Sequence, residues 1–552
     1  MNKKNNQITG GELIVSSLKN LGVKNCFGVP GESYLAVLDA LFDNNVEFTI
    51  CRQEGAASFA SSAWGKLTGK PGICFVTRGP GATNASIGIH TAMQDSSPMI
   101  LFVGQINNNH RGREAFQEVD YKSFFSSIAK WSVEIDNVDR IPEIILRAWK
   151  TAIVGRPGPV VIGIPENILT DLTSEKPCKN INFYEASPHI SSIEKIKEIL
   201  LNSKNPIVLA GGGGWNEKGR KYLKKFVERE NLPFIALFRY QDIFDNYSPC
   251  YIGDAGVGMA GYIEDTIKNA DVILSINGRF GEMTTKGWSL LDVPYSKQKI
   301  IHSHSSDLEL GKIIAPEIAV HAGPNEMAKF LFYKIKLKNK SKNSLKKLKV
   351  LREKFIKFSL PPKQNSPVDM SYVMKWLQNN LDEDVVITNG AGNFSLWPNK
   401  CFKFGKNQTL LAPQSGAMGY GLPAAIAAGL SDKKRQIVCF AGDGDIQMGL
   451  AELGTAVQNG LKIIIIILNN ESYGTIRMHQ EKFYPGRISG TNLVNPDFSK
   501  IAQSWGMFGK RILNTKDFAE AFKEAAMSEK GGILDLKINV EAISPYKTLS
   551  SL

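Results

Sequence analysis

Short apolar segments alternate with amphipathic segments of helical length along the whole chain. The apolar segments have strand length, end in glycine or polar residues, and include 71–77, 98–103, 159–164, 206–209, 272–276 and 437–440. Strands buried on both faces show such continuous apolar runs, and their alternation with helices is typical of parallel sheets covered by helices. The pattern predicts the α/β class with doubly wound parallel sheets.

The length of the chain and two breaks in this pattern predict three domains. At 552 residues the chain exceeds what one hydrophobic core supports, and domains of roughly 150 to 200 residues predict about three. One break falls at 173–187 and the other in the lysine-rich run that leads into Leu360-Pro361-Pro362. We therefore predict domains at 1–180, 188–340 and 365–552, and the two outer ones are candidates for the same kind of sheet used twice.

The net charge of +13 is concentrated in residues 334–357, where lysine alternates mainly with Asn, Ser and Leu. Apart from Phe355 this run has no aromatic residue on which a base could stack. We interpret it as a solvated linker between domains and expect no nucleic-acid binding.

The N-terminus and the cysteines indicate the compartment. The first residues lack the apolar core of a signal peptide, and no run in the chain approaches the roughly 18 apolar residues of a membrane span. The seven cysteines are scattered and contain no Cys-x-x-Cys pair. We expect a cytoplasmic protein that does not bind membranes and whose cysteines are reduced core residues.

Residues 437–470 carry the clearest chemical signal, a strand, a Gly-Asp-Gly turn, a helix and a second strand that ends in Asn469-Asn470. Neighbouring parallel strands would bring Asp443 and Asn470 to the same sheet edge. A carboxylate, an amide oxygen and a backbone carbonyl, completed by phosphate oxygens and water, form the octahedral oxygen shell that Mg²⁺ prefers. Gly442 and Gly444 would let backbone amides approach a diphosphate. A plain βαβ unit with a tight turn is the alternative.

Gly-Asp-Gly followed by Asn-Asn resembles the signature of thiamine-diphosphate (ThDP) enzymes, and the resemblance covers nearly the whole chain. It implies pyrimidine-binding, middle and diphosphate-binding domains. It further implies that Asp443, Asn470 and the main-chain oxygen of Ser472 hold Mg²⁺. Gly416 falls where the family has a carbonyl acceptor for the 4′-amino group of the cofactor, and Met418 falls where it has an apolar side chain that bends the cofactor between its rings. The other cofactor-binding positions that it implies are Pro30, Asn84, Gly390, Gly392, Asn393, Gly442, Gly444 and Asp445.

Glu54 lies in the segment Cys51-Arg52-Gln53-Glu54-Gly55-Ala56-Ala57, which resembles the glutamate motif of the same family. In that family the glutamate protonates N1′ of the aminopyrimidine and so activates the cofactor. The resemblance implies that Glu54 is catalytic and that it meets Asp443 across a subunit interface, so that a monomer is inactive. A surface glutamate at a helix start is the alternative.

Four further segments, 79–84, 90–98, 115–120 and 155–160, resemble the acetolactate synthase large (catalytic) subunit family. The resemblance implies decarboxylation of a pyruvate-like 2-oxo acid and carboligation to a second carbonyl, as in branched-chain amino acid biosynthesis. It also implies a homodimer or dimer of dimers and suggests a small regulatory subunit. Phe116 and Gln117 would reach the active site from the partner subunit, and Lys130 falls near a pocket lysine of the family. Phe116 as plain core and Lys130 as a solvated base are the alternatives.

Three positions depart from that family. Met283 stands where the family has a basic residue that helps bind the second oxo acid, and His479 stands where a tryptophan shapes the acceptor pocket. Glu32 replaces a small residue and resembles the acidic catalytic residue of simple 2-oxo acid decarboxylases; it could equally be a helix-start carboxylate. A non-ligating decarboxylase or a C–C lyase on the same fold is therefore the alternative function.

Binding of FAD is left open by the sequence. Arg156 and Arg279 match positions near the flavin in the acetolactate synthases. The middle segment has only a loose glycine run at 211–214, without the GxGxxG spacing of a dinucleotide site. A ThDP-fold sensor protein is the non-enzymatic alternative, and the intact Glu54, Asp443 and Asn470 argue against it.

Overall fold

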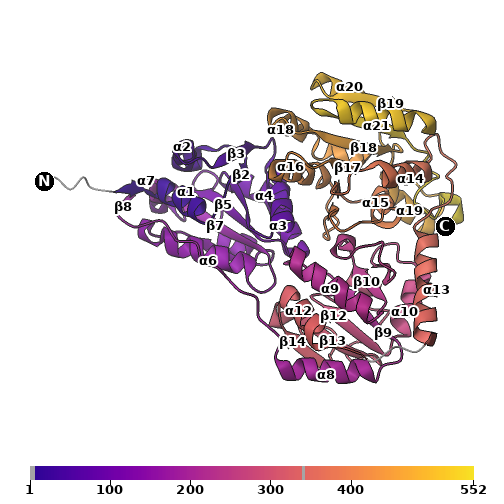
Figure 1. Ribbon diagram of the computed structural model, residues 1–552. Helices are drawn as coiled ribbons and strands as arrows, with labels where there is room; N and C mark the ends of the chain where they lie inside the picture. The colour runs from indigo at the N-terminus through magenta and orange to yellow at the C-terminus, as the bar shows by residue number, and fades with distance from the viewer. Residues whose placement is uncertain (1–6, 338–341) are drawn as a thin grey trace. The chain divides into compact units, whose positions relative to one another are not determined.

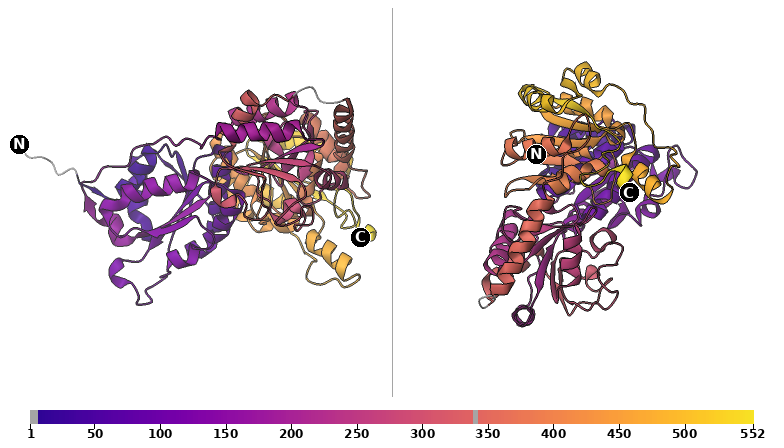
Figure 2. Two further views of the ribbon diagram at one scale, coloured as in Figure 1. Left: turned by 90° about the horizontal axis from the view of Figure 1, so that it is seen from below. Right: turned by 90° about the vertical axis from the view of Figure 1, so that its right-hand side faces the viewer.

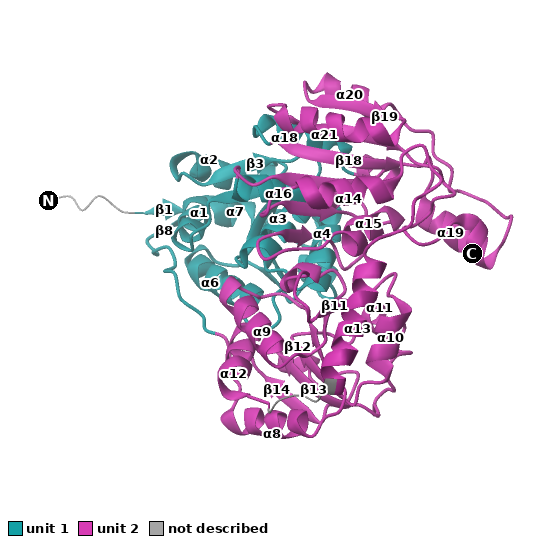
Figure 3. Cartoon of the chain, turned by 45° about the vertical axis from the view of Figure 1, so that its right-hand side comes forward, with its two compact units in different colours: residues 1–184, 422–432, 449–461 teal, residues 185–421, 433–448, 462–552 magenta. Residues whose placement is uncertain are grey.

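The computed structural model describes residues 7–337 and 342–552. The chain divides into two compact units (Figure 3). Unit 1 comprises residues 1–184, 422–432 and 449–461, and unit 2 comprises residues 185–421, 433–448 and 462–552. Unit 1 contains one parallel six-stranded sheet and unit 2 contains two.

The sheet of unit 1 has the strand order β3-β2-β4-β5-β7-β6. Its strands are β2 Asn25–Gly28, β3 Glu47–Ile50, β4 Gly72–Val76, β5 Met99–Gln105, β6 Trp131–Glu134 and β7 Pro159–Pro165. The helices of this domain are α1 Gly10–Asn20, α2 Leu35–Asp43, α3 Glu54–Thr68, α4 Gly79–Asp95, α5 Tyr121–Phe125, α6 Ile141–Ile153 and α7 Glu166–Thr170. A small antiparallel pair joins β1 Ile8–Thr9 to β8 Leu172–Thr173.

Helices cover both faces of this sheet, as the apolar runs predict. Helices α1, α2 and α6 pack on one face, and α3 and α4 pack together on the other (Figure 1). Phe75 and Phe102 from neighbouring strands stack with ring centroids 4.7 Å apart in the core. Burial of one such ring is worth roughly 1.5–3 kcal/mol, so this pair contributes to the stability of the unit 1 core.

The middle sheet, in unit 2, has the order β11-β10-β9-β12-β13-β14. Its strands are β9 Pro206–Ala210, β10 Phe234–Leu237, β11 Tyr251–Ala255, β12 Val272–Ile276, β13 Lys299–His304 and β14 Ile318–His321. Its helices are α8 Ile190–Leu201, α9 Glu217–Arg229, α10 Gly261–Lys268, α11 Glu282–Thr285 and α12 Pro324–Lys334. This is the 3-2-1-4-5-6 order of a doubly wound nucleotide-binding fold.

The C-terminal sheet, also in unit 2, has the order β16-β15-β17-β18-β20-β19. Its strands are β15 Val386–Asn389, β16 Thr409–Leu411, β17 Ile437–Gly442, β18 Ile463–Asn469, β19 Phe508–Ile512 and β20 Gly531–Lys537. The helices are α14 Met370–Asn380, α15 Leu396–Cys401, α16 Gly421–Ser431, α17 Asp443–Gln447, α18 Leu453–Gln458, α19 Gly474–Phe483, α20 Phe498–Ser504 and α21 Phe518–Met527. Most of α16 and all of α18 belong to unit 1.

The two outer sheets share one topology, in which the strands follow the order second, first, third, fourth, sixth, fifth. The prediction of three doubly wound parallel-sheet domains is confirmed, as is the repeated use of one sheet type. The boundaries at 180, 188, 340 and 365 stay predictions.

The prediction of a solvated linker at 334–357 is wrong for the residues that the structure describes there. Lys342–Phe358 form α13, a long helix of unit 2 (Figure 2). Leu348 and Phe355 are buried in the core of the middle domain, and Arg352 donates hydrogen bonds to the carbonyl oxygens of Asn246 and Tyr251. The apolar residues recur at helical spacing on one face, which the density of lysine obscures in the sequence. Residues 338–341 of the predicted linker lie outside the described residues.

All seven cysteines are buried and free, which confirms their interpretation as core residues. Within the part of the chain that the structure describes, no helix is long and apolar enough to cross a membrane.

Candidate functional site

A cavity of about 250 Å³ lies at the carboxyl edge of the C-terminal sheet, where β15 and β17 are neighbours and the strand order reverses. Such a switch point is the usual ligand site of an open α/β sheet. Most of the predicted cofactor and metal positions of this domain line the cavity: Gly392, Asn393, Gly416, Met418, Gly442, Asp443, Gly444, Asp445, Asn470 and Ser472. The remaining predicted position, Gly390, directly follows β15.

Asp443 is the first residue of α17 and directly follows β17, which ends at Gly442. Gly442 pairs in register with Leu468, so the ends of β17 and β18 meet at this edge. The Asp443 carboxylate accepts hydrogen bonds from the backbone N–H groups of Gly444 and Glu471. Burial nevertheless raises the pKa of Asp443 above its usual range.

Asn495 is a residue of this site that the sequence analysis missed. Its Nδ2 donates to Oδ2 of Asp443 at 2.7 Å and to Oδ1 of Asn469 at 2.9 Å. Asn469 in turn donates to Asp535 at 2.9 Å, so the predicted Asp443 is held by a chain of amide side chains. Asn495 comes from a loop well beyond the second strand, and no spacing marks it in the sequence.

Asn470 and Ser472 lie in the segment that follows β18. The backbone N–H of Ser472 donates to Oδ1 of Asn470 at 3.2 Å, and Glu471 between them has a positive φ of 56°. The neighbouring backbone is fixed by a bond from Tyr473 N–H to the Thr491 carbonyl at 2.8 Å. Among the described residues, the buried hydroxyl of Ser472 has no hydrogen-bond partner.

This oxygen-rich corner fits a hard divalent cation. It offers a carboxylate, an amide and the polar groups of Ser472 at one cavity. Within residues 7–337 and 342–552 no three His, Cys, Asp or Glu side chains form a metal cluster, so protein carboxylates alone complete no shell. A cation here would need further oxygen ligands, as Mg²⁺ typically takes from phosphate and water.

Asp445 joins the two glycine-rich loops of the cavity. Its fully buried carboxylate accepts hydrogen bonds from the backbone N–H groups of Ala391 at 3.2 Å and Gly419 at 3.0 Å. Burial raises the pKa of Asp445 to about 7. A Cβ atom on Gly390 would lie 2.1 Å from Asp445 Oδ1, so only glycine fits there.

In unit 1, Glu54 is the first residue of α3 and follows β3. Asn84 of α4 donates from Nδ2 to Glu54 Oε2 at 2.9 Å, so the structure brings these two predicted residues together. Glu452, which the sequence analysis missed, accepts from the backbone N–H groups of Arg52 at 2.8 Å and Gln53 at 3.1 Å. Asn84 therefore positions the Glu54 carboxylate, and Glu452 positions the backbone directly before Glu54.

Glu32 lies at the switch point of the unit 1 sheet, where β2 and β4 are neighbours and where Pro30 also follows β2. Its Oε1 is 2.8 Å from Nη2 of Arg78, the second residue after β4. The same nitrogen is 2.8 Å from Oε1 of Glu166, which follows β7. Arg78 was not predicted as a site residue, because its partners Glu32 and Glu166 lie 46 and 88 positions away in the sequence and no spacing connects them.

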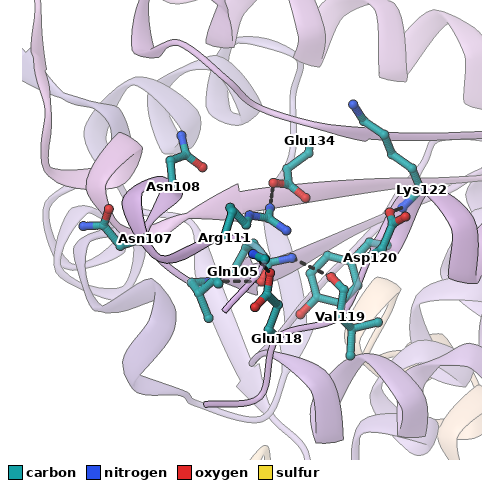
Figure 4. Close-up of polar contacts among 12 residues, drawn as sticks. Gln105, Asn107, Asn108, Arg111, Glu118, Val119, Asp120, Lys122 and Glu134 are labelled. Carbon is teal, nitrogen blue, oxygen red and sulfur yellow. Dashed lines mark hydrogen bonds and ion pairs between the residues drawn. The ribbon is translucent and has the colours of Figure 1, made fainter. Parts of the chain in front are cut away.

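Phe116 and Gln117 lie on a braced loop after β5. The Phe116 side chain is 72% exposed, and Gln117 has a positive φ of 64°. Figure 4 shows the bracing: Arg111 pairs with Glu134, and Gln105 Nε2 donates to the Val119 carbonyl at 2.8 Å. A strained residue beside an exposed aromatic ring is typical of a loop that binds a ligand or partner.

The remaining predicted residues contact the protein itself. Lys130 donates to the carbonyl oxygens of Thr151, Val154 and Arg156, and burial lowers its pKa to about 8. The predicted flavin residue Arg156 donates to Ser96 Oγ at 3.0 Å.

Arg279 and His479, which the sequence predicts as a flavin residue and a substrate-pocket residue, do not line the cavity described above. Arg279 donates to Gln414 at 2.9 Å. His479 is exposed on α19 and stacks on Phe483 with ring centroids 6.1 Å apart.

Comparison with known families identifies the class of protein that this fold and site define. The N-terminal binding domain, central domain and C-terminal binding domain of thiamine pyrophosphate enzymes match residues 8–124, 193–331 and 390–535. The chain is therefore a thiamine pyrophosphate (ThDP) enzyme.

Named relatives narrow the family. The chain is 31% identical to the mitochondrial acetolactate synthase of Schizosaccharomyces pombe, over 95% of this chain and 82% of that protein. It is 30% identical to the acetolactate synthase large subunit of Cyanidium caldarium (97% and 94%) and 28% identical to the isozyme 2 large subunit of Escherichia coli (97% and 96%). The chain belongs to the acetolactate synthase family.

Proposed function

We propose that this enzyme binds ThDP with Mg²⁺, decarboxylates a pyruvate-like 2-oxo acid and joins the acyl unit to a second carbonyl. The observation that carries the proposal is the convergence of Asp443, Asn470 and Ser472 with two glycine-rich loops on one cavity at a sheet switch point. The family membership supports the same chemistry.

In this proposal the Asp443 carboxylate, the Asn470 amide oxygen and the main-chain oxygen of Ser472 hold Mg²⁺. Asn495 orients Asp443, as partners of metal ligands commonly do. When bound, ThDP supplies the carbon nucleophile and takes up the electron pair released with CO₂. A Cβ atom on Gly390 would lie 2.1 Å from Asp445 Oδ1, and one on Gly392 would lie 2.9 Å from Phe394 Cδ1, so the packing of the loop after β15 requires glycine at both positions.

With ThDP bound, the Glu54 carboxyl group would donate a proton to N1′ of the aminopyrimidine. Asn84 donates to Glu54 Oε2 and so fixes the rotamer of this carboxylate, while Glu452 holds the backbone that precedes it. A positioned acid of this kind contributes typically 10²–10⁴-fold to a rate. We therefore assign catalysis to Glu54 and positioning to Asn84 and Glu452.

We further propose a homodimer, or a dimer of dimers, with active sites shared between subunits. Several large apolar side chains are exposed on the single chain, among them Phe116, Phe483 and Tyr484. Helix α19 and the loop after it, which carry the last two, extend from the body of unit 2 (Figures 2 and 3). Exposed apolar groups gathered on such segments indicate a surface that a partner covers.

Membership of the acetolactate synthase family raises two further questions, a regulatory subunit and a flavin cofactor. Several relatives are named large subunits, which supports a small regulatory subunit as a partner of this chain. Binding of FAD stays a prediction, which the visible absorbance of the purified protein would test. The two arginines that the resemblance places near a flavin, Arg156 and Arg279, donate hydrogen bonds to protein side chains in this structure.

The test is incubation of the purified chain with ThDP, Mg²⁺ and a panel of 2-oxo acids, with CO₂ and products followed by mass spectrometry. We expect Mg²⁺-dependent CO₂ release and a carboligation product, and loss of both in Asp443→Ala. Free aldehyde as the sole product would instead assign a non-ligating decarboxylase. Cleavage of a hydroxyketone without action on any 2-oxo acid would assign a C–C lyase.

A further inference from the structure

The carboxyl edge of the unit 1 sheet carries a row of charged side chains. The strand order β3-β2-β4-β5-β7 places Glu54, Glu32, Arg78 and Glu166 along this edge, since each follows one of these strands. Glu32 follows the strand next to that of Glu54, and Arg78 follows the strand beyond it. Adjacent strands of a sheet lie about 4.8 Å apart. The row therefore begins beside the predicted activating carboxylate.

One guanidinium in this row is shared by two carboxylates. The side chain of Arg78 is only 10% exposed, whereas those of Glu32 and Glu166 are 71% and 38% exposed. Nη2 of Arg78 contacts both carboxylates at 2.8 Å, and the buried Nε has no hydrogen-bond partner in the described chain. The Glu32–Arg78–Glu166 cluster thus carries a net charge of about −1 at neutral pH, with its negative groups facing solvent.

The exposed ring of Phe116 adds an apolar wall to this cluster. The guanidinium carbon of Arg78 lies 6.0 Å from the Phe116 ring centroid. Gly79, the residue after Arg78, donates its N–H to the Gln117 carbonyl at 3.1 Å, which ties the braced loop to the cluster. The edge therefore combines a negative rim with an apolar surface.

We propose that the Glu32–Arg78–Glu166 cluster selects the acceptor of the reaction, and that this acceptor is an uncharged aldehyde rather than a second 2-oxo acid. This inference rests on the proposed function. A net negative cluster disfavours an anionic acceptor by like-charge repulsion and leaves an aldehyde unaffected.

The two substrates differ in how long they carry charge. The C1–C2 bond of the donor 2-oxo acid breaks, CO₂ leaves, and the remaining electron pair forms a new C–C bond with the acceptor carbonyl carbon. The acceptor oxygen takes up one proton, so atoms and charge balance without any oxidant. The donor loses its carboxylate before the acceptor reacts, whereas an anionic acceptor would keep its charge into the product. The repulsion therefore acts on the acceptor throughout its addition.

The test is a competition between acceptors. The holoenzyme with ThDP and Mg²⁺ is given pyruvate with an equal concentration of acetaldehyde, and the hydroxyketone and the acetohydroxy acid are quantified. We expect the wild-type enzyme to favour the hydroxyketone. Glu32→Gln neutralises one exposed carboxylate and should shift the product ratio toward the acetohydroxy acid by about two- to fivefold, as expected for a charge that is largely exposed to solvent. Glu166→Gln should shift the ratio in the same direction.

The matched control is Glu47→Gln, which removes an exposed glutamate at the opposite, amino end of β3 and should leave the ratio unchanged. An unchanged ratio in Glu32→Gln, or a wild-type preference for the oxo acid, would overturn the inference. Reduced release of free aldehyde at constant ratio would assign Glu32 to protonation and also overturn it. Absence of CO₂ release from every 2-oxo acid of the panel, without any acceptor added, would reject the proposed function itself, a result distinguishable from the others.

Discussion

The carboxylate of Glu452 accepts a hydrogen bond at 2.8 Å from the backbone N–H of Arg52, 400 positions earlier in the chain. It accepts a second bond, at 3.1 Å, from the N–H of Gln53 and so holds the residues directly before Glu54. Burial raises the pKa of Glu452 above its usual range. Because its carboxylate is buried and bound to these two backbone N–H groups, we assign Glu452 a role in positioning Glu54 and not in the reaction itself.

Glu452→Ala should destabilise unit 1 and slow turnover. Two backbone N–H groups would lose their acceptor, at a cost of about 1–3 kcal/mol. Glu452→Gln keeps a carbonyl acceptor and serves as the matched control. Thermal unfolding and kcat measure the effect; equal melting temperatures for Ala and Gln variants would show that these hydrogen bonds contribute no stability.

Glu54→Gln should bind ThDP nearly as well as wild type and lose activity by about 100-fold or more, since only the acid is removed. Asn84→Ala should lower kcat by roughly tenfold through loss of the bond to Glu54 Oε2. In the Glu54→Gln background the Asn84 change should add little, because both act through one carboxylate. Additive losses in steady-state kinetics would separate their roles.

Asn495→Ala should weaken Mg²⁺ binding by about 10- to 100-fold, because Asp443 and Asn469 would lose their shared donor. Calorimetric titration of Mg²⁺ in the presence of ThDP measures this affinity. Asn380→Ala, at an exposed helix end, is the control. Wild-type affinity in Asn495→Ala would remove Asn495 from the site.

The thiols should be unreactive in the native protein at pH 8. Burial raises the pKa of Cys74, Cys401 and Cys439 to about 12. Because the folded state keeps these protons above pH 9 while the unfolded state loses them, their contribution to stability falls as the pH rises from 9 toward 12. A thiol reagent should therefore modify all seven cysteines only after denaturation; fast native labelling would contradict this burial.

Phe355→Ala should cost about 3–5 kcal/mol, because this ring is buried in the middle domain. Lys354→Ala, one residue earlier on the exposed side of α13, should change stability by less than about 0.5 kcal/mol. Chemical denaturation compares the two. Equal effects would support a solvated linker in place of the packed helix.

Local patterns in the sequence predicted much of the fold and of the cofactor site. The apolar run at 272–276 coincides with β12, and those at 71–77 and 437–440 fall within two residues of the observed strands. Gly-Asp-Gly and Asn-Asn predicted the ends of β17 and β18 to within one residue, and the structure brings Asp443 and Asn470 to one cavity. The lysine-rich run was misinterpreted because charge density hid the apolar spacing of α13.

By itself the sequence determined the α/β class, the three sheets and the residue types at the strand ends, because strand periodicity and glycine turns are local properties of the backbone. Only the tertiary structure decided which distant side chains meet: Glu32 with Arg78 and Glu166, Asp443 with Asn495, and Arg52 with Glu452. The order of strands in the sheet and the paths of the loops bring these pairs together. Neither can be derived from the local sequence around each residue. The contacts of Arg78 and Glu452 could therefore be read only from the folded chain.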